Sequence, residues 1–549
     1  MTSAGSDELA RIQPFARERF GYDQLTAGQQ EAISALLNGH DTLAVLPTGS
    51  GKSAIYQIAG LMLTGTTVVI SPLIALQQDQ VESLEALGIA DAASINSTLR
   101  AAERREAWKD LADGDLDFIF LAPEQFDQPE TLQRLEDVRP ALFVVDEGHC
   151  IVEWGHDFRP DYLRLGSVIE ALGHPPVLAL TATAAPLVRD EIVERLGFHA
   201  PRIVVRDFDR PNIWLGARRF DDEPSKWIAL VEEVVDADKP GIVYAATHKH
   251  VEQLASTLQQ RGLAVAAYHG GLPARERESA QRRFMEDEVE VIVATNAFGL
   301  GIDKADVRFV FHADICDSVD SYYQEIGRAG RDGKPARAML FYRPEDLHLQ
   351  RFFAGGGSID AEQVELVART IEEHRGPIEV EELKEETDLS GRKIETVLIN
   401  LEQVGAIDRV PTGEVVEDTH SKDLDSVAAE AVEREEQRRR VEQSRIEMMR
   451  AYAEVRDCRR RFMLNYLGEP FEDLCGYCDN CDARTQAEDV IHPFPLNSRV
   501  RHPKWGDGLV IHYEGDTMTV MFDTDGYKSL DVSLVIERDL LCAVDDLDT

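Results

Sequence analysis

Two successive series of short, β-rich apolar runs, separated by helical patterns, constrain the fold of this chain more than any other feature. Such runs alternating with helices are typical of parallel sheets that helices cover on both faces. The sequence therefore predicts two α/β lobes, each with a parallel sheet, joined near residues 206–213. The runs are TLAVLP (42–47), TTVVIS (66–71), LDFIFLAP (116–123), ALFVVDE (141–147) and PVLALTAT (176–183), then GIVYA (241–245), AVAAYH (264–269), VEVIVAT (289–295), VRFVFHAD (307–314) and ARAMLFY (336–342).

The rest of the chain changes character after a glycine-rich break at residues 354–358. Residues 361–417 read as three helices and an extended segment, which is the order of a winged helix. Residues 425–467 hold no Gly or Pro, which favours a helical hairpin ahead of a cluster of cysteines. The β-rich tail at 493–541 predicts a small barrel of SH3 or Tudor type. The expected domains are 1–210, 211–353, 357–420, 425–485 and 492–545.

A glycine-rich loop follows the first predicted strand and opens a helix. In this context backbone N–H groups cradle phosphates, Lys52 reaches the outer phosphates and Ser53 binds Mg²⁺. Leu46 stands where the general pattern has glycine, and a glycine-rich turn without function is the alternative for this segment alone. The candidate nucleotide-binding residues of the loop are Thr48, Gly49, Ser50, Gly51, Lys52 and Ser53.

Two adjacent acids, Asp146 and Glu147, close the apolar strand ALFVV. At the end of a strand, Asp146 suits coordination of Mg²⁺, and Glu147 can orient or deprotonate the attacking water. The alternative for an isolated acid pair is a solvated loop.

Two arginines, Arg328 and Arg331, stand three residues apart in the run QEIGRAGR, which predicts that they share one face of a helix. Arginine is the side chain suited to stabilising charge on a transferring phosphoryl group, so both are candidate catalytic residues. Structural ion pairs are the alternative.

The phosphate loop, the acid pair and the arginine pair, in this order over two lobes, resemble the motifs of superfamily 2 helicases, and further motifs resemble those of the RecQ family. The resemblance covers about residues 10–345 and resumes at the cysteines. The further motifs are Phe20-Gly21-Tyr22 with Gln29, Thr181-Ala182-Thr183, the aromatic-rich run WGHDFRP at 154–160, and AFGLGIDK at 297–304.

The resemblance implies roles that the residues alone do not give. Tyr22 would stack on adenine, Gln29 would hydrogen-bond it, and Arg331 would be the arginine finger, supported by Arg328. Thr26 stands where the family usually has arginine, so the adenine would lose one stacking partner. The resemblance also assigns Asp303 to the nucleotide site, and Trp154, His156, Phe158 and Arg159 to sensing single-stranded DNA and coupling it to hydrolysis.

Four cysteines, Cys458, Cys475, Cys478 and Cys481, have a spacing that can close a tetrahedral thiolate site for structural Zn²⁺. The spacing also resembles the zinc module of the RecQ family. In that family a winged helix follows the zinc module, whereas here the winged-helix pattern precedes it and is acidic. Whether this element binds DNA, through residues such as Arg392 and Lys393, stays open.

The charge balance is unusual, with 100 acidic against 58 basic residues, of which only 12 are lysine, and a net charge of −42. Composition alone argues against nucleic acid, which prefers a basic face. Adaptation to high internal salt is a second interpretation of the same acidity. The motifs therefore have to decide the partner.

The motifs predict an ATP- and Mg²⁺-dependent DNA helicase of RecQ type, which the resemblance suggests moves 3′ to 5′ in DNA repair or recombination. Its expected substrates are single-stranded DNA and duplexes with an overhang. The alternatives are a DNA-stimulated ATPase or translocase, a transcription-linked scaffold without strand separation, and an RNA helicase.

The β-rich tail predicts partners of the protein, and the distribution of apolar residues predicts its localisation. The tail resembles the C-terminal module of the UvrD/PcrA helicases, which is linked to RNA polymerase, so RNA polymerase or repair proteins are expected partners. A generic stabilising barrel is the alternative. No apolar run of about 18 residues and no signal peptide are read, so we expect a cytoplasmic, nucleoid-associated protein without a membrane span.

Overall fold

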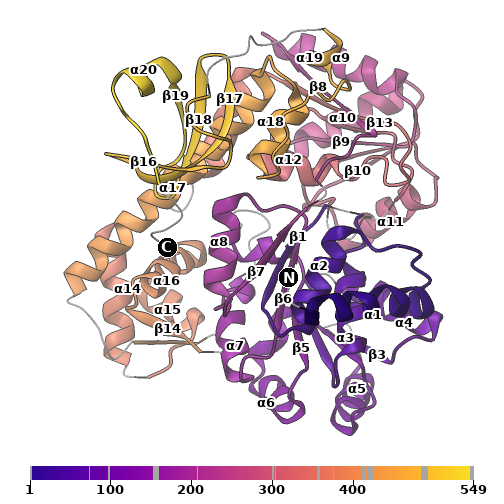
Figure 1. Cartoon of the computed structure of the whole chain (residues 1–549), viewed down its shortest axis with the longest axis vertical. Coiled ribbons are helices and arrows are strands. Elements are labelled where there is room, and N and C mark those ends of the chain that lie inside the picture. The colour runs from indigo at the N-terminus through magenta and orange to yellow at the C-terminus, as the bar shows by residue number, and fades with distance from the viewer. Residues whose placement is uncertain are drawn as a thin grey trace. The chain divides into compact units, whose positions relative to one another are not determined.

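The computed structural model describes residues 3–47, 49–72, 74–96, 99–152, 160–206, 208–299, 302, 304–354, 359–374, 376–410, 414–417, 424–483 and 492–544. The chain divides into two compact units (Figure 1). The first unit comprises residues 1–46, 50–206 and 357–436, and the second comprises residues 47–49, 207–356 and 437–549.

The first lobe is built on a seven-stranded sheet in which every pairing is parallel. Strands β1, β2, β4, β5 and β6 are buried along their whole length, which explains why they read as continuous apolar runs. In sheet order the strands are β3 (Ala92–Ile95), β4 (Phe118–Leu121), β2 (Thr67–Ile70), β5 (Leu142–Val145), β6 (Val177–Thr181), β1 (Thr42–Val45) and β7 (Arg202–Val205).

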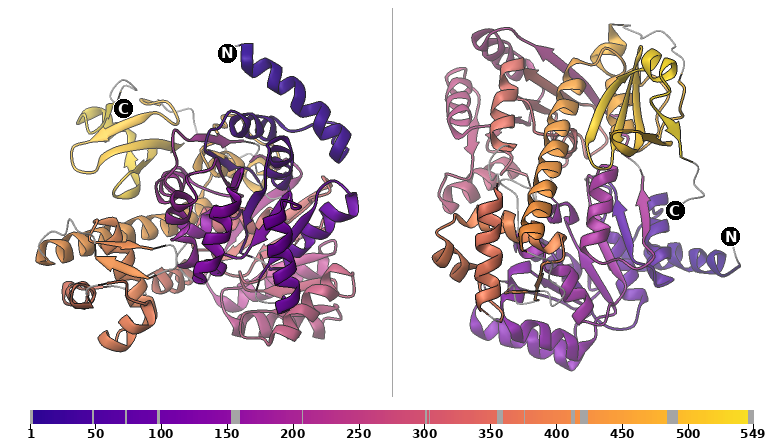
Figure 2. Two further views of the ribbon diagram at one scale, coloured as in Figure 1. Left: turned by 90° about the horizontal axis from the view of Figure 1, so that it is seen from below. Right: turned by 90° about the vertical axis from the view of Figure 1, so that its left-hand side faces the viewer.

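Helices flank this sheet on both sides (Figures 1 and 2). They are α1 (Ser3–Phe20), α2 (Ala27–Leu37), α3 (Ser53–Met62), α4 (Ile74–Leu87), α5 (Ala101–Asp113), α6 (Pro129–Val138), α7 (Leu165–Ala171) and α8 (Pro186–Arg195), with short 3-10 turns η1 (Pro123–Asp127), η2 (Gly148–Ile151) and η3 (Pro160–Tyr162).

The second lobe has a six-stranded parallel sheet of the same kind. Side chains of Asp222, Thr247 and Ser318 accept backbone N–H bonds at the starts of three of its helices, which fixes where those helices begin. The strands, in sheet order, are β10 (Val265–Tyr268), β11 (Val291–Ala294), β9 (Gly241–Tyr244), β12 (Phe309–His312), β13 (Ala336–Tyr342) and β8 (Ile213–Arg219), and the helices are α9 (Glu223–Asp236), α10 (His248–Gln260), α11 (Ala274–Met285), α12 (Val319–Ile326), η4 (Pro344–Asp346) and α13 (Leu347–Ala354).

Residues 359–417 form a small element with a core of its own, which includes Ile371, Leu383 and Leu398. Its helices are followed by a two-stranded antiparallel sheet, and Ile378 pairs with Val415 as a third, single-residue rung. The elements are α14 (Ala361–His374), α15 (Val380–Thr387), α16 (Gly391–Gln403), β14 (Ile407–Arg409) and β15 (Val415–Glu417).

The segment after this element, for which a helical hairpin was predicted, holds two helices of unequal length. It holds one helix of 31 residues, α17 (Leu424–Glu454), about 46 Å long at 1.5 Å per residue, and then the short helix α18 (Arg459–Tyr466) (Figure 2). Arg459 donates to the carbonyl oxygen of Tyr452, so α18 turns back against the end of α17. The cysteine-rich turn then carries α19 (Asp479–Asp482).

The tail folds into a five-stranded antiparallel sheet with one short helix. Its core includes Val510, Val520 and Phe522, with Trp505 packed against it. In sheet order the strands are β19 (Gly526–Asp531), β18 (Thr517–Phe522), β17 (Gly506–Glu514), β16 (Arg499–His502) and β20 (Cys542–Ala543), and the helix is α20 (Val532–Glu537).

All ten predicted apolar runs contain a strand, so the two-lobe prediction is confirmed. Three further strands of the lobes, β3, β7 and β8, were not predicted. Strand β8 (Ile213–Arg219) begins where the predicted link between the lobes ends. Within the described residues no helix is both long and apolar enough to cross a membrane.

Candidate functional site

The predicted phosphate loop lies between β1 and α3. Gly49 and Gly51 have positive φ angles of 78° and 70°, which favour glycine. The Nζ of Lys52, just before α3, donates to the carbonyl oxygen of Leu46, 3.2 Å away. Ser53 opens the helix, whose first N–H groups have no acceptor within the helix. This loop can bind a phosphate group at the N-terminus of α3.

Gln29 ties α2 to the phosphate loop through the nitrogen of its side-chain amide, while the oxygen of the same amide caps α2. Its Oε1 accepts from the backbone N of Thr26 at 2.9 Å, and Thr26 Oγ1 accepts from the backbone N of Gln29 at 3.2 Å, which is a capping box. Its Nε2 donates to the carbonyl oxygens of Ser50 and Gly51 at 2.9 and 3.0 Å. Thr26 therefore has the role of helix cap in this fold, a role that the comparison with arginine did not suggest.

Tyr22 lies in the turn between α1 and α2 and is 39% exposed. Its ring is nearly parallel to that of Phe20, with centroids 5.9 Å apart. Burial and then Asp146 raise the pKa of the Tyr56 hydroxyl in the first turn of α3, and nearby Tyr22 raises it further by a smaller amount. Tyr22 therefore lies close to the helix that follows the phosphate loop.

The acid pair follows β5, at the carboxyl end of the sheet. The backbone N of Asp146 donates to the carbonyl oxygen of Ile70, and Asp146 Oδ1 accepts from the backbone N of Glu147 at 3.0 Å. Burial and the Glu147 carboxylate raise the pKa of Asp146 to about 7, whereas the Lys52 ammonium lowers it. The same crowding of negative charge favours binding of a divalent cation, so these oxygen ligands fit Mg²⁺.

A buried histidine links the acid pair to the strand between it and the phosphate loop. His149 Nδ1 lies 3.3 Å from Glu147 Oε2 and 3.0 Å from Thr181 Oγ1, at the end of β6. Thr181 Oγ1 in turn donates to the carbonyl oxygen of Thr183. This chain of contacts therefore joins the carboxyl ends of β5 and β6, and β6 lies next to β1, the strand that leads into the phosphate loop.

The two arginines of the second lobe lie outside the helix on which they were expected. Helix α12 ends at Ile326, and Gly327 caps it, so Arg328 and Arg331 lie in the turns that follow rather than on one helical face. Arg328 is buried and its Nη1 donates to the carbonyl oxygen of Gly299, close to the AFGLGIDK motif. Gly330 has a φ of 56°, which is why glycine separates the two arginines.

Several predicted residues lie outside the described part of the chain. They are Thr48 in the phosphate loop, Asp303, and the aromatic-rich residues Trp154, His156, Phe158 and Arg159.

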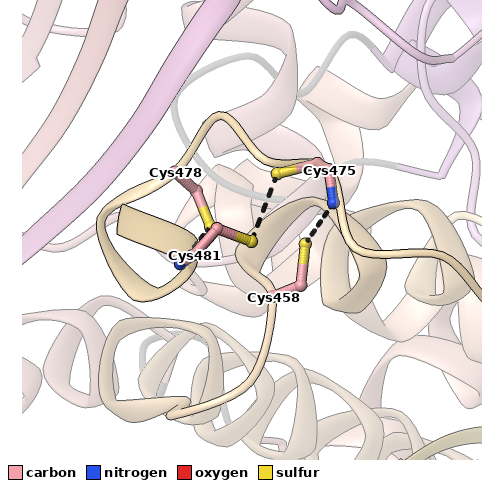
Figure 3. Close-up of side chains that lie close together, drawn as sticks. All are labelled: Cys458, Cys475, Cys478 and Cys481. Atoms are coloured by element: carbon pink, nitrogen blue, oxygen red, sulfur yellow. Dashed lines mark hydrogen bonds between the residues drawn. The ribbon is translucent and has the colours of Figure 1, made fainter. Parts of the chain in front are cut away.

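The four cysteines converge as predicted (Figure 3). All four Sγ atoms lie within 4.8 Å of one another, and Cys475 Sγ is 3.9 Å from Cys481 Sγ. A tetrahedral site with Zn–S bonds of about 2.3 Å has sulfur–sulfur edges of about 3.8 Å. Backbone N–H groups of Cys475 and Cys481 donate to the sulfurs of Cys458 and Cys478, each at 3.4 Å, which supports thiolate ligands. The geometry fits Zn²⁺.

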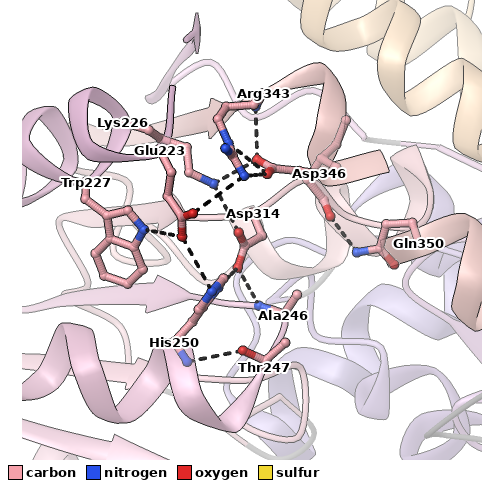
Figure 4. Close-up of polar contacts among 11 residues, drawn as sticks. Glu223, Lys226, Trp227, Ala246, Thr247, His250, Asp314, Arg343, Asp346 and Gln350 are labelled. Carbon is pink, nitrogen blue, oxygen red and sulfur yellow. Dashed lines mark hydrogen bonds and ion pairs between the residues drawn. The ribbon is translucent and has the colours of Figure 1, made fainter. Parts of the chain in front are cut away.

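A second polar cluster is buried in the second lobe, where α9, β12 and η4 meet (Figure 4). Lys226 Nζ lies 3.1 Å from Asp314 Oδ1 and 2.8 Å from Asp346 Oδ2, and Asp314 Oδ2 bonds the backbone N of Ala246 and His250 Nδ1. Burial alone would raise the pKa of Asp314, but His250 and Lys226 hold it below its usual value. Every charge in the cluster has a partner, so it holds the lobe together.

Three family models match consecutive parts of the chain. A DEAD/DEAH box helicase model matches residues 26–191, a helicase conserved C-terminal domain model matches residues 225–333, and a RecQ zinc-binding model matches residues 418–482.

Individual relatives extend these matches. The probable ATP-dependent DNA helicase RecS of Bacillus subtilis is 41% identical over 366 residues, which cover 66% of this chain and 73% of that protein. The ATP-dependent DNA helicase RecQ of the same organism is 34% identical over 486 residues, 88% of this chain and 68% of that protein. The chain belongs to the RecQ family of ATP-dependent DNA helicases.

Structural comparison agrees at the level of the fold. The crystal structure of the DUF1998 helicase MrfA bound to DNA has a TM-score of 0.50 at 19% identity, over 76% of this chain and 60% of that one. This similarity supports the fold of the two parallel-sheet lobes, which is RecA-like. This RecQ helicase uses ATP with Mg²⁺, and its cysteine cluster binds Zn²⁺.

Proposed function

We propose that this RecQ helicase hydrolyses ATP with Lys52 and Ser53 at the phosphates and Mg²⁺, Asp146 as a further magnesium ligand, and Glu147 as the residue that orients the attacking water. One observation carries the proposal. The Lys52 ammonium acts on the Asp146 carboxylate at the carboxyl edge of one parallel sheet, where this class of fold binds its ligands. When bound, Mg²⁺ neutralises charge on the phosphates.

Glu147 has a built-in orientation in this proposal. Its contact with the buried His149, which is itself bonded to Thr181, restricts the carboxylate to a narrow range of positions. A carboxylate fixed in this way can accept a proton from water without first reorganising. Arg331 is the proposed arginine finger, with Arg328 supporting it, because arginine best stabilises charge on the transferring phosphoryl group.

Recognition of the base and of DNA completes the proposal. Tyr22 stacks on adenine. Gln29 already uses its amide at Thr26 and the phosphate loop, so hydrogen bonding to adenine requires it to give up one of those bonds. Asp303 belongs to the nucleotide site, and Trp154, His156, Phe158 and Arg159 sense unpaired DNA by stacking and charge.

The cellular role follows from the family. The helicase moves 3′ to 5′ on the strand it tracks, opens duplexes with a single-stranded overhang, and serves DNA repair or recombination on chromosomal DNA in the cytoplasm. In this proposal the domains have the boundaries 1–210, 211–353, 357–420, 425–485 and 492–545. Within them, residues 357–420 are a winged helix, and residues 492–545 are an SH3- or Tudor-like barrel that contacts RNA polymerase or repair proteins.

A strand-displacement assay coupled to ATP hydrolysis tests the proposal. Lys52→Ala and Glu147→Gln should abolish DNA-stimulated hydrolysis, and Arg331→Ala should keep ATP binding but hydrolyse it slowly. Lys109→Ala is the matched control, because Lys109 is an exposed lysine of the same lobe that forms an ion pair with Asp113, one turn along the same helix. Near-normal turnover in Lys52→Ala or Glu147→Gln would reject the mechanism.

The same assay tests the substrate and the polarity. DNA and RNA duplexes carrying a 3′ or a 5′ overhang should be compared at equal ATP. Displacement of DNA from the 3′-overhang substrate alone is expected. Hydrolysis that DNA stimulates without displacement of any strand would favour a translocase instead.

A further inference from the structure

The backbone of the arginine segment, residues 327–331, is held mainly by one half-buried side chain, that of Arg210. Arg210 Nη1 donates to the carbonyl oxygen of Gly327 at 3.1 Å, and its Nη2 donates to those of Ala329 and Gly330 at 2.8 and 3.1 Å. Asn212 adds a bond to the Gly330 carbonyl at 2.8 Å. Three carbonyl groups around Arg328 and Arg331 therefore point at the same guanidinium group, which fixes the path of the turn.

Arg210 is in turn held by the zinc module. Arg460, two residues after the zinc ligand Cys458, donates to the carbonyl oxygens of Arg210 and Ile213 at 3.0 and 2.6 Å. Its Nε lies 3.3 Å from the carboxylate of Asp209, and only 4% of its side chain is exposed. Because Cys458 is the residue that caps α18, the metal site sets where Arg460 stands.

The zinc module also holds the far end of α12. Asp320, in the first turn of α12, is buried, and its Oδ2 accepts from the Tyr466 hydroxyl at 2.6 Å. Arg445 of α17 pairs with the same oxygen at 3.3 Å. The helix that leads into the arginine segment is therefore bonded at its start by Tyr466, and the segment at its end is bonded through Arg460 and Arg210.

We propose that Arg210 and Arg460 are positioning residues for ATP hydrolysis: the zinc module, through Arg460 and then Arg210, holds the arginine segment in the place from which Arg331 acts. The inference rests on the proposed role of Arg331. It assigns the zinc module a function in catalysis beyond folding of the module itself. A displacement of about 1 Å in a catalytic group can cost roughly 100-fold in rate, so the support of this segment matters.

Steady-state ATP hydrolysis with saturating single-stranded DNA tests the inference. Arg210→Gln and Arg460→Gln should each lower kcat by about 10- to 100-fold and leave KM for ATP within about twofold, because positioning of the finger matters in the transition state. Arg461→Gln is the matched control, since Arg461 is the next residue of α18 and pairs with Asp457 instead. Zinc content and melting temperature are measured on every variant.

Combination with Arg331→Ala separates positioning from a merely structural role. If Arg460 acts through Arg331, the double variant is no slower than Arg331→Ala alone, because residues that act as a unit are not additive. Fully multiplicative losses, or an unchanged kcat in both Arg210→Gln and Arg460→Gln, would overturn the inference. An unchanged kcat in Arg331→Ala itself would instead overturn the proposed function, and the inference with it.

A conservative variant covers the case in which Arg460→Gln loses zinc. Lysine at this position keeps a positive charge for Asp209 and one donor for a carbonyl oxygen, so Arg460→Lys should keep its zinc and show an intermediate kcat. A wild-type kcat in Arg460→Lys together with a wild-type kcat in Arg210→Gln would again overturn the inference.

Discussion

The substitution Gln29→Glu tests whether this residue shapes the phosphate loop or reads the base. Glutamate has the size of glutamine and keeps an oxygen for the backbone N of Thr26, but it loses both donors to Ser50 and Gly51. Each lost bond is worth about 0.5–1.5 kcal/mol, so the loop is weakened by about 1–3 kcal/mol. In nucleotide affinity that is about 5- to 150-fold.

Comparison of the affinity loss for ATP with that for GTP distinguishes the two roles of Gln29. In the proposed mechanism the loop contacts phosphates and not the base, so binding of ATP and of GTP should weaken by the same factor. The assay is equilibrium binding of fluorescent ATP and GTP analogues with Mg²⁺ and without DNA. Thr26→Ala is the control: it removes the helix cap, at a cost of about 1 kcal/mol in stability, and leaves the two bonds to the loop in place.

Two results would refute this reasoning. A loss confined to ATP, with GTP unchanged, would mean that Gln29 recognises adenine directly and that its bonds to the loop are incidental. If Gln29→Glu binds both ATP and GTP as tightly as the wild type does, the loop holds its shape without Gln29.

Three further outcomes follow from the structure. Lys226→Met leaves Asp314 and Asp346 buried without their shared cation and should cost about 3–5 kcal/mol in the free energy of unfolding, measured by denaturant titration, whereas the exposed Lys249→Met should change it little. One zinc per chain is expected by elemental analysis, and Cys478→Ser should lose it and lower the melting temperature, because structural zinc contributes folding energy; zinc-free fresh protein would contradict the site. The net charge of −42 predicts that the melting temperature rises as salt increases from about 0.01 to 1 M, over which the Debye length falls from roughly 30 to 3 Å; a flat or falling curve would contradict this prediction.

The strands that sequence alone predicts are those whose burial is complete. The strand β5 is apolar at every position because both of its faces are covered. By contrast, β7 begins with two exposed residues at the edge of its sheet, and β8 ends in two arginines. Strand β8 donates hydrogen bonds to Asp479 and Asp482 of the zinc turn, more than 200 residues away. No local sequence pattern predicts these contacts.

The candidate site divides in the same way. The sequence predicts Lys52 because it lies in a glycine-rich loop between a strand and a helix, and it predicts Asp146 and Glu147 because they come directly after a strand. Other contacts could not be predicted, because they depend on where a distant segment is placed. They are the contact of His149 with Thr181 and the hydrogen bond from Arg210 to Gly330. The mistaken helix for Arg328 and Arg331 has a local cause, since Gly327 ends α12 just before them.

A large share of the negative charge of the chain lies in one segment, residues 357–436. Residues 357–436 hold 23 acidic and 8 basic residues, a net −15 of the −42 in the whole chain. A winged helix that reads DNA presents its third helix to a groove and its basic residues to phosphates. Here α16 is buried from Thr396 to Leu401, and Asn400 on it donates to the Glu435 carboxylate of α17.

The packing of α16 against α17 limits how this element can contact DNA. A helix packed beneath α17 cannot enter a groove unless α17 leaves, and leaving would expose Val427, Ala428 and Ala431 of the same core. An element with a net charge of −15 also repels the phosphates that supply most non-specific affinity. We therefore expect the two lobes to supply most of the DNA contacts, and we expect residues 357–420, which the notably acidic segment includes, to contribute little to DNA binding.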